Sequence, residues 1–108
     1  MATTPVITRI ETLRNPEYPE IVWTRIYSSD GFVGLGETSF SPDAIEAYIH
    51  NDIKKYLLGK NPDNLDMHWD VLGRRMKVNR GRSVDASSVS AIDMALWDLY
   101  AKRVNQPL

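Results

Sequence analysis

The stretch Ile92-Asp93-Met94-Ala95-Leu96-Trp97-Asp98-Leu99-Tyr100-Ala101 is apolar at almost every position and is interrupted by only two aspartates. It lies inside a helix that the spacing predicts over about residues 85–104. A helix that is apolar all round is normally buried all round. The rest of the chain is too short to cover this whole circumference. We therefore expect either self-association or a further segment that packs on the outer face of this helix.

Length and composition limit the class of protein. The chain has 108 residues, of which 43% are hydrophobic and 25% charged, which is typical of one folded domain. Its net charge of −1 argues against a dedicated nucleic-acid binder, and the absence of cysteine excludes disulfides and thiolate chemistry. No apolar run approaches a membrane span of about 20 residues, and residues 1–5 do not resemble a secretory signal. We expect a cytoplasmic domain that binds neither nucleic acid nor membrane.

The first third of the chain has the composition of β-strands. Residues Val6–Arg14, Glu20–Ser28 and Phe32–Thr38 are rich in β-branched and aromatic residues. Residues Asn15–Pro19 contain two prolines, which cannot donate ladder hydrogen bonds, so we expect a loop there. Asp30-Gly31 between two apolar runs indicates a hairpin turn. Together these features predict a three-stranded antiparallel meander.

The pattern changes to helical spacing after the third strand. Ser41-Pro42-Asp43 is typical of a helix start, with a capping serine and a proline at the first helical position. Apolar residues then recur at helical spacing up to Leu57, and Gly59 is a suitable left-handed stop. Asn61-Pro62-Asp63 repeats the same start signal for a second helix. The apolar stripe that we expect on this second helix consists of Leu65, Trp69, Leu72 and Met76. The chain is thus predicted to be an α+β domain, a meander followed by about three helices.

A glycine-rich segment invites a nucleotide-binding interpretation, which its context does not support. Gly34-Leu35-Gly36-Glu37 begins like a dinucleotide fingerprint, but the third glycine is missing and no helix follows at once. Gly34 and Gly36 are better explained by a bulge or close packing in the third strand. Glu37 is interpreted as a structural feature of the hairpin rather than a catalytic acid.

The titratable residues do not form an evident catalytic centre. His50 and His68 are 18 positions apart, lack metal-binding spacing, and are interpreted as surface or packing histidines. Asp93 and Asp98 lie about 140° apart around a helix, so they do not converge on one point. A salt bridge or a cap to another element is the favoured role for them.

Five basic residues fall within nine positions, and no acidic residue lies among them. Such a cluster suits either an anion site or a helix C-terminus followed by a solvated loop, and the near-neutral total charge favours the second interpretation. The five residues are Arg74, Arg75, Lys77, Arg80 and Arg82.

Three segments resemble one known family. Asp30–Glu37 resembles the hairpin signature "dGx-xGxGE" of the mandelate racemase and muconate lactonizing enzyme group of the enolase superfamily, and Leu58–Pro62 resembles its "l-iGkdP" link. Ser90–Leu99, followed by Lys102 and Pro107-Leu108, resembles its "sAidiAlWDl-gKa-g-Pl" helix. The resemblance extends from Val6 to the end of the chain. It departs from the family pattern at Asn105, where glycine is usual, and at Leu35, where tryptophan is frequent.

The resemblance implies that residues 1–108 are one N-terminal capping domain and a fragment of a larger enzyme. In that family the capping domain covers the mouth of a TIM barrel, which carries the Mg²⁺ ligands and the acid–base residues. This chain lacks the barrel, so we expect it to hold no catalytic or metal-binding residue and to be inactive alone. The resemblance also implies two partners, the barrel of the same polypeptide and further copies of the enzyme in a homo-oligomer.

Two loops of this family reach toward the substrate, and they correspond to residues 14–19 and 38–42. The resemblance implies that Arg14 meets an anionic or hydroxylated substrate and that Tyr18 and Phe40 wall the pocket. It also implies that Thr38 and Ser39 donate hydrogen bonds to, or accept them from, substrate hydroxyls. These five residues are the candidate substrate-binding residues.

The segment 36–50 is most similar to sugar-acid dehydratases. The implied parent enzyme is a lyase that removes water from an acid sugar by α-proton abstraction, with the enediolate stabilised by Mg²⁺. A racemase or a cycloisomerase of the same group remains open, since all share that first step. The rival interpretation is a stand-alone interaction module that uses the apolar helix over 85–104. A nucleic-acid-binding domain that uses the basic cluster is the less favoured rival.

Overall fold

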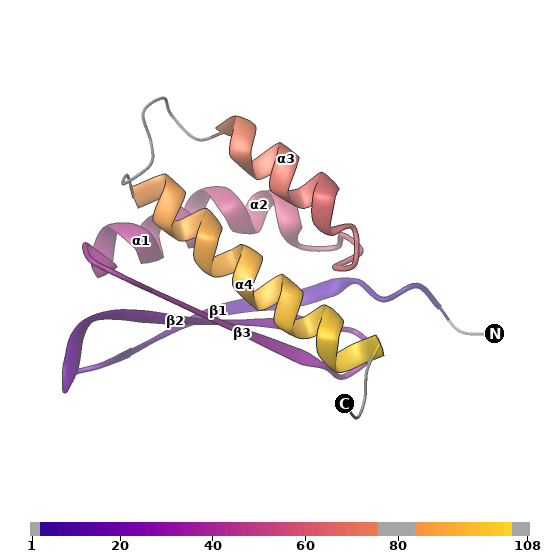
Figure 1. Cartoon of the computed structure of the whole chain (residues 1–108), viewed down its shortest axis with the longest axis horizontal. Helices are drawn as coiled ribbons and strands as arrows, with labels where there is room; N and C mark the ends of the chain where they lie inside the picture. The colour runs from indigo at the N-terminus through magenta and orange to yellow at the C-terminus, as the bar shows by residue number, and fades with distance from the viewer. Residues whose placement is uncertain (1–2, 76–83, 105–108) are drawn as a thin grey trace.

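Three antiparallel strands form one sheet, and the helices cover one of its faces (Figure 1). The computed structural model describes residues 3–75 and 84–104. The strands are β1 (Ile7–Asn15), β2 (Tyr18–Ser28) and β3 (Val33–Ser39), in the spatial order β1-β2-β3. This order confirms the predicted antiparallel meander and, with the helices that follow, the α+β class.

The first connection is shorter than the two prolines suggest. Only Pro16 and Glu17 form the turn, because Tyr18 and Pro19 already belong to β2 and Tyr18 pairs with Asn15. The expected loop over 15–19 is therefore wrong in extent. Pro19 is tolerated because it lies at a register irregularity, where the ladder requires no amide donor. The second connection agrees with the prediction, since Gly31 adopts a φ of +96° in the turn between β2 and β3.

The helical layer that covers the sheet begins with one continuous helical stretch. It consists of α1 (Pro42–Tyr48), the π-helical segment η1 (Ile49–Ile53) and α2 (Lys54–Leu57). Its buried residues are spaced four apart, at Ile45, Ile49, Ile53 and Leu57. Four residues of an α-helix rotate by about 400°, so such a row drifts by about 40° at every step. The wider π turn offsets this drift and keeps the row against the sheet. Gly59 ends the stretch with a φ of +84°, as predicted.

The next helix starts later than the sequence signal suggests. The Asn61 side chain accepts a hydrogen bond from the Asp63 amide at 2.9 Å, which makes a local turn, and α3 runs over Leu65–Arg75. Its buried face holds Leu65, Leu72 and, unexpectedly, His68. The predicted stripe is wrong at Trp69, which is about half exposed, and Met76 lies outside the described residues.

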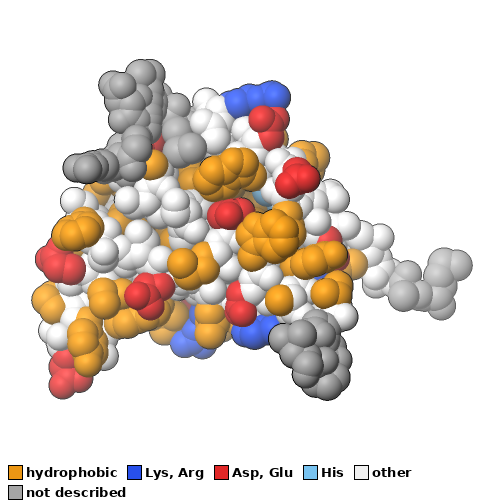
Figure 2. Space-filling view, viewed as in Figure 1, with side chains coloured by type: hydrophobic (Ala, Val, Ile, Leu, Met, Phe, Trp, Pro, Cys, Tyr) orange, Lys and Arg blue, Asp and Glu red, His pale blue; other side chains and the backbone are white. Residues whose placement is uncertain are grey.

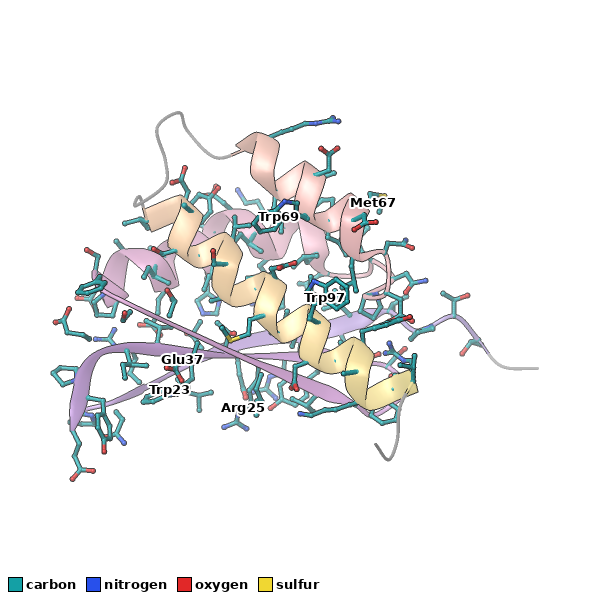
Figure 3. All side chains as sticks on the ribbon, in the orientation of Figure 1. Trp23, Arg25, Glu37, Met67, Trp69 and Trp97 are labelled. Carbon is teal, nitrogen blue, oxygen red and sulfur yellow. The ribbon has the colours of Figure 1, made fainter. Side chains whose placement is uncertain are left out.

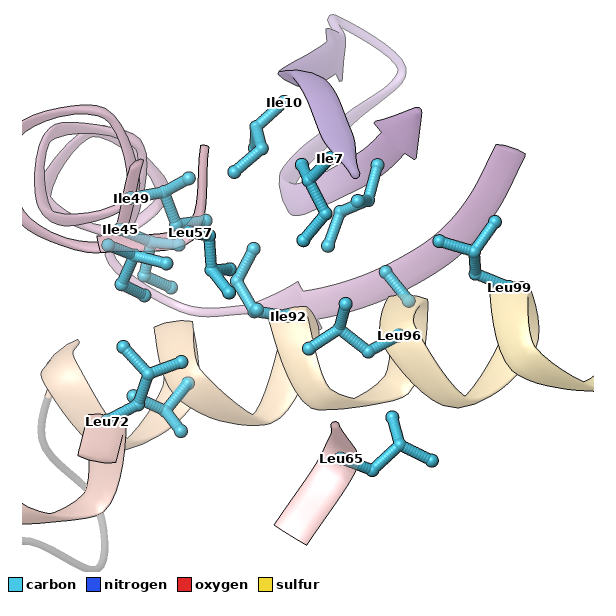
Figure 4. Packing of buried hydrophobic residues seen from close by; sticks show 14 of the residues in the cluster. Ile7, Ile10, Ile45, Ile49, Leu57, Leu65, Leu72, Ile92, Leu96 and Leu99 are labelled. Atoms are coloured by element: carbon cyan, nitrogen blue, oxygen red, sulfur yellow. The ribbon is translucent and has the colours of Figure 1, made fainter. Parts of the chain in front are cut away.

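The last helix, α4 (Val84–Val104), lies along the sheet, and its inner face completes the core (Figure 4). Ile92, Leu96 and Leu99 are fully buried there. The outer face carries Met94, Trp97 and Val104, and Trp97 is 51% exposed. Hydrophobic side chains are accordingly visible over the helical face in Figure 2. The described part of the chain thus leaves an apolar strip of this helix uncovered, as its all-round apolar pattern led us to expect. None of the described helices is long and apolar enough to cross a membrane.

Gly34 and Gly36 set the distance between α4 and β3. A Cβ atom on Gly34 would lie 2.0 Å from the carbonyl oxygen of Ala95, and one on Gly36 would lie 2.1 Å from that of Ala91. Both distances are far below contact, so only glycine allows the helix backbone to approach this closely. The structure confirms close packing as the reason for these glycines.

Asp98 and Lys102 attach α4 to the free edge of β3. The Leu35 amide donates to Asp98 Oδ2 at 2.9 Å, and Lys102 Nζ donates to the carbonyl oxygen of Val33, also at 2.9 Å. The two side chains are themselves paired at 2.8 Å. Unpaired backbone groups of an edge strand normally face solvent or another strand, and here side chains satisfy two of them. This arrangement confirms the structural role inferred for Asp98. Asp93 lies on the same helix, and burial raises its pKa.

Arg103, in the same last turn of α4 as Lys102, joins three segments. Its guanidinium donates to both carboxylate oxygens of Asp30 in the β2–β3 turn, at 2.6 and 3.2 Å. It also donates to the hydroxyl of Ser28 at 2.9 Å and to the carboxylate of Asp63 before α3. The hydrogen bond from Arg103 is the main reason why the pKa of Asp30 falls from 3.8 to about 2.

The close approach at Gly34 predicts a large cost for one methyl group. Gly34→Ala should destabilise the chain by about 1–3 kcal/mol or more, because the helix must move away from the strand. Leu35→Ala is the matched control on the outer face of the same strand and should cost less than about 1 kcal/mol. Urea unfolding of the three proteins measures the difference. Equal stability of Gly34→Ala and the wild type would contradict the packing argument.

The Arg103–Asp30 contact predicts a pH-dependent stability. The folded-state pKa of Asp30 is lowered, so its contribution is present in full above about pH 5 and is lost as the pH falls toward 2. Asp30→Asn should lower the free energy of unfolding at pH 7 by about 1 kcal/mol. The gap between wild type and variant should close on acidification. Urea unfolding between pH 2 and pH 7 tests this, and a gap that does not change with pH would refute it.

Candidate functional site

Two connections lie side by side at the end of the sheet opposite the β2–β3 turn. In a meander the β1–β2 turn and the C-terminal end of β3 lie at the same end of the sheet. The register confirms this by pairing Ile21 with Ser39. The amide of Phe40 also donates to the carbonyl oxygen of Glu20 at 3.0 Å. The two loops proposed from the sequence, 14–19 and 38–42, are therefore neighbours, and we call them together the loop edge.

The backbone of the loop edge is held in an unusual conformation. Phe40 and Ser41 have φ angles of +72° and +50°, a region that side chains other than glycine seldom adopt. Each such residue costs on the order of 1 kcal/mol. Phe40 is nonetheless 74% exposed, so the described part of the chain does not bury the ring in return. Such strain at an exposed position is typical of functional loops.

Ser41 does not cap the following helix in the predicted manner. It occupies the cap position of α1, but its side chain makes no capping hydrogen bond. Its backbone is left-handed, whereas N-cap residues usually adopt the β region, and the Ser41 carbonyl still accepts from the Ile45 amide at 3.0 Å. The predicted helix start at Pro42 is confirmed, and the predicted side-chain cap is wrong.

An aromatic pair lies on the outer face of the sheet beside the loop edge. Tyr18 is 55% exposed and contacts Trp23 edge-on, with ring centres 6.4 Å apart. The indole nitrogen of Trp23 donates to Glu37 Oε1 at 3.2 Å, and Figure 3 shows the two side chains next to each other on β2 and β3. Glu37 therefore orients Trp23, in agreement with the structural role inferred for it.

Thr38 and Ser39 do not face the same side. Consecutive residues of a strand point to opposite faces, and both are partly buried here. Thr38 shares the helix-covered face with Gly34 and Gly36, whereas Ser39 shares the outer face with Glu37. A single small ligand on one face of β3 would therefore meet one of these hydroxyls first.

Arg14 points to α1 instead of to open solvent. Its Nη1 lies 2.9 Å from Asp43 Oδ1 and 2.9 Å from Glu46 Oε1, and its Nη2 lies 3.4 Å from the carbonyl oxygen of Pro19. The hydrogen bond to Asp43, followed by that to Glu46, raises the pKa of Arg14 above its ordinary value. Sequence reasoning missed these partners because they lie about 30 residues away on another element.

A shallow pocket of about 360 Å³ lies on the outer face of the sheet next to Arg14. None of the other four candidate residues lines it. Sequence reasoning missed this pocket, although the outward-facing Leu13, Trp23 and Leu35 signal an apolar patch through their strand alternation. The lining residues are Leu13, Arg14, Asn15, Trp23, Thr24, Arg25, Leu35 and Gly36.

The two histidines pack against other elements, as inferred. The imidazole of His68 is fully buried, with Nε2 2.7 Å from the carbonyl oxygen of Asn61 and Nδ1 2.8 Å from the hydroxyl of Tyr56. A carbonyl accepts only, so Nε2 carries a proton and donates to Asn61. His50 Nε2 lies 2.9 Å from the Thr12 hydroxyl.

The described residues do not bring three histidine, aspartate or glutamate side chains together in a group that could hold a metal ion. The basic cluster is described only at its start, where Arg74 pairs with Asp70 at 2.6 Å. Lys77, Arg80, Arg82 and the side chain of Arg75 lie outside the described residues.

Solved structures with this fold come from proteins that are much longer. An enolase protein from the environmental genome sequencing of the Sargasso Sea matches with a TM-score of 0.86 and 35% identity, over 92% of this chain and 27% of that one. A magnesium-bound racemase from Streptomyces coelicolor matches with a TM-score of 0.80 and 33% identity, over 91% and 31% of the two chains.

A third match is an enolase from Pantoea ananatis that was solved with bound D-gluconate and magnesium. It has a TM-score of 0.79 and 28% identity, over 92% of this chain and 25% of that one. In these three comparisons the chain spans between a quarter and a third of the other protein. The profile of the mandelate racemase / muconate lactonizing enzyme N-terminal domain matches residues 1–108. The chain therefore belongs to the mandelate racemase and muconate lactonizing enzyme family, whose N-terminal capping domain it represents.

Proposed function

We propose that this chain is the substrate-capping domain of a Mg²⁺-dependent sugar-acid dehydratase of the enolase superfamily. The observation that carries this proposal is the exposed, left-handed Phe40 on one of two neighbouring loops, the other of which carries the exposed Tyr18. A strained aromatic edge that the domain does not bury is suited to close over a ligand held elsewhere. The relative with bound D-gluconate and magnesium supports an acid sugar as the substrate class.

In this proposal the chemistry and the closure belong to different parts of one longer polypeptide. A C-terminal barrel would provide the metal ligands and the acid–base residues, since barrel active sites lie at the mouth that a cap can cover. Mg²⁺ would stabilise the negative charge that develops when the proton α to the carboxylate leaves. The capping domain would exclude water and select among substrates that share this reaction.

We assign the contacts of the loop edge by chemistry. Tyr18 and Phe40 would form an apolar wall, and they are the two most exposed aromatic side chains of the loop edge. Thr38 or Ser39 would hydrogen-bond a sugar hydroxyl, one on each face of β3. Arg14 already contacts the carboxylates of Asp43 and Glu46.

The uncovered face of α4 supports a second candidate, a protein-interaction module. Met94, Trp97 and Val104 are exposed there, and Trp69 extends the apolar surface onto the neighbouring α3 (Figure 3). Exposed apolar patches of this kind mark interaction surfaces. Under the first proposal the barrel or another subunit covers the same face. Turnover by the full-length polypeptide separates the two candidates.

The proposed reaction predicts a specific product. The full-length polypeptide with Mg²⁺ should convert an aldonic or aldaric acid into its 2-keto-3-deoxy acid, which can be detected as a semicarbazone. Removal of the metal by a chelator should abolish turnover, and the 108-residue chain should show none. Metal-dependent racemisation or cycloisomerisation without loss of water would contradict the dehydratase assignment.

The strained backbone predicts opposite effects of one substitution on stability and activity. Phe40→Gly should raise the free energy of unfolding of the chain by about 1 kcal/mol, because glycine adopts a positive φ without penalty. It should lower kcat/KM of the full-length enzyme about tenfold, because the aromatic wall is lost.

Phe40→Ala separates the two effects. It removes the ring but keeps a Cβ atom in the left-handed position, so it should lose activity without a gain in stability. Urea unfolding and steady-state kinetics on both variants measure this. If Phe40 were only a turn residue, Phe40→Gly would stabilise the chain and leave kcat/KM unchanged.

A further inference from the structure

Arg14 joins the first loop of the loop edge to the helix that follows the second loop. It is the first residue of the first loop, and its guanidinium donates to the carbonyl oxygen of Pro19 at the other end of that loop. The same guanidinium contacts Asp43 and Glu46 in α1, the helix that follows the second loop directly. The side chain thus connects the segment that carries Tyr18 to the segment that carries Phe40.

Glu46 is the firmer of the two acidic partners. The side chain of Asp43 is 96% exposed, so solvent weakens its attraction, whereas that of Glu46 is 27% exposed. Arg14 contacts Glu46 Oε1, and the Thr12 hydroxyl donates to Glu46 Oε2 at 2.6 Å. Because that hydroxyl donates to Glu46, it accepts from Nε2 of His50. Both oxygens of Glu46 are therefore fixed by β1.

A second connection runs parallel to this one. The amide of Phe40 donates to the carbonyl oxygen of Glu20, one residue beyond Pro19. The backbone hydrogen bond thus holds the second loop itself, while Arg14 holds the helix that follows that loop. Such a pair of contacts restricts relative motion of the loops far more than either contact alone.

The local charge argues against Arg14 as a ligand for an anionic substrate. The guanidinium carries one positive charge, and Asp43 and Glu46 together carry two negative charges around it. A substrate carboxylate that approached this group would meet a net negative charge. The planar fork of arginine, in contrast, suits simultaneous contacts to two carboxylates and a carbonyl.

We propose that Arg14 is a positioning residue that couples the two loops, so that Tyr18 and Phe40 close on the substrate as one unit. This inference rests on the proposed capping function. It assigns Arg14 a partner, Glu46, and a role in closure, whereas the family resemblance implied direct contact with the substrate.

The test is a double-mutant cycle in the full-length enzyme with Mg²⁺ and its acid-sugar substrate. Arg14→Gln and Glu46→Gln should each lower kcat about tenfold, because the bound substrate reacts more slowly when the two loops of the loop edge are not correctly placed over it. The double variant should lose no more than either single variant, since both changes break one connection. Arg9→Gln is the matched control, because Arg9 pairs with Glu11 at 2.7 Å on the exposed side of the same strand, and its kinetics should stay unchanged.

A substrate ligand would behave differently. If Arg14 bound the substrate carboxylate, Arg14→Gln would mainly raise KM, and Glu46→Gln would leave KM unchanged or lower it by removing a negative charge. Arg14→Lys adds a further distinction, because it keeps the charge but loses the fork. It should recover less than half of the lost kcat if the geometry matters, and full recovery would overturn the proposal.

Hydrogen exchange tests the coupling without reference to activity. In the full-length polypeptide, the amide of Phe40 should exchange several-fold faster in Arg14→Gln and in Glu46→Gln than in the wild type or in Arg9→Gln. Unchanged exchange would overturn the proposal even if the enzyme were active. Faster exchange in a polypeptide that does not act on acid sugars would instead support the coupling and contradict the proposed function.

Discussion

The close contact between α4 and β3 determines how the rest of this domain is arranged. Two glycines remove the side chains that would separate the helix from the strand, and Asp98 and Lys102 then satisfy backbone groups on the strand edge. Space and hydrogen bonding therefore specify the same position of the helix. With α4 fixed, the sheet has one covered face, and the meander places the two candidate substrate-binding loops together at one end.

The two ends of the sheet serve different purposes. At the end that holds the β2–β3 turn, Arg103 gathers Asp30, Asp63 and Ser28, and the pKa of Asp30 is lowered accordingly. At the loop edge, Phe40 and Ser41 lie in a strained conformation. A domain can retain such strain only when other contacts offset its cost, and the core along α4 together with the Arg103 contacts provides them.

Local patterns in the sequence predicted most of the fold but not the contacts between distant residues. The meander, the glycine turns and the long apolar helix follow from short-range rules and were found in the structure. The π turn over 49–53, the outward position of Trp69 and the partners of Arg14 were not predicted, because each depends on packing between elements far apart in the chain. For the candidate site, the family resemblance located the loops, while only the structure showed that Thr38 and Ser39 face opposite sides.

The described contacts of Phe40 itself do not recover the cost of its backbone conformation. Its ring stays largely in solvent, its backbone lies where glycine is favoured, and Ser41 beside it gains no capping hydrogen bond. A loop selected only for folding would avoid all three features, and it would not need a guanidinium shared between two carboxylates to hold its neighbour in place. Contacts elsewhere in the domain retain this strain, and the loop itself gains no stability from it. Under the proposed capping function, a substrate enclosed beneath the loop edge would contact Phe40 and recover part of the cost there, whereas a partner bound only to the apolar face of α4 would not.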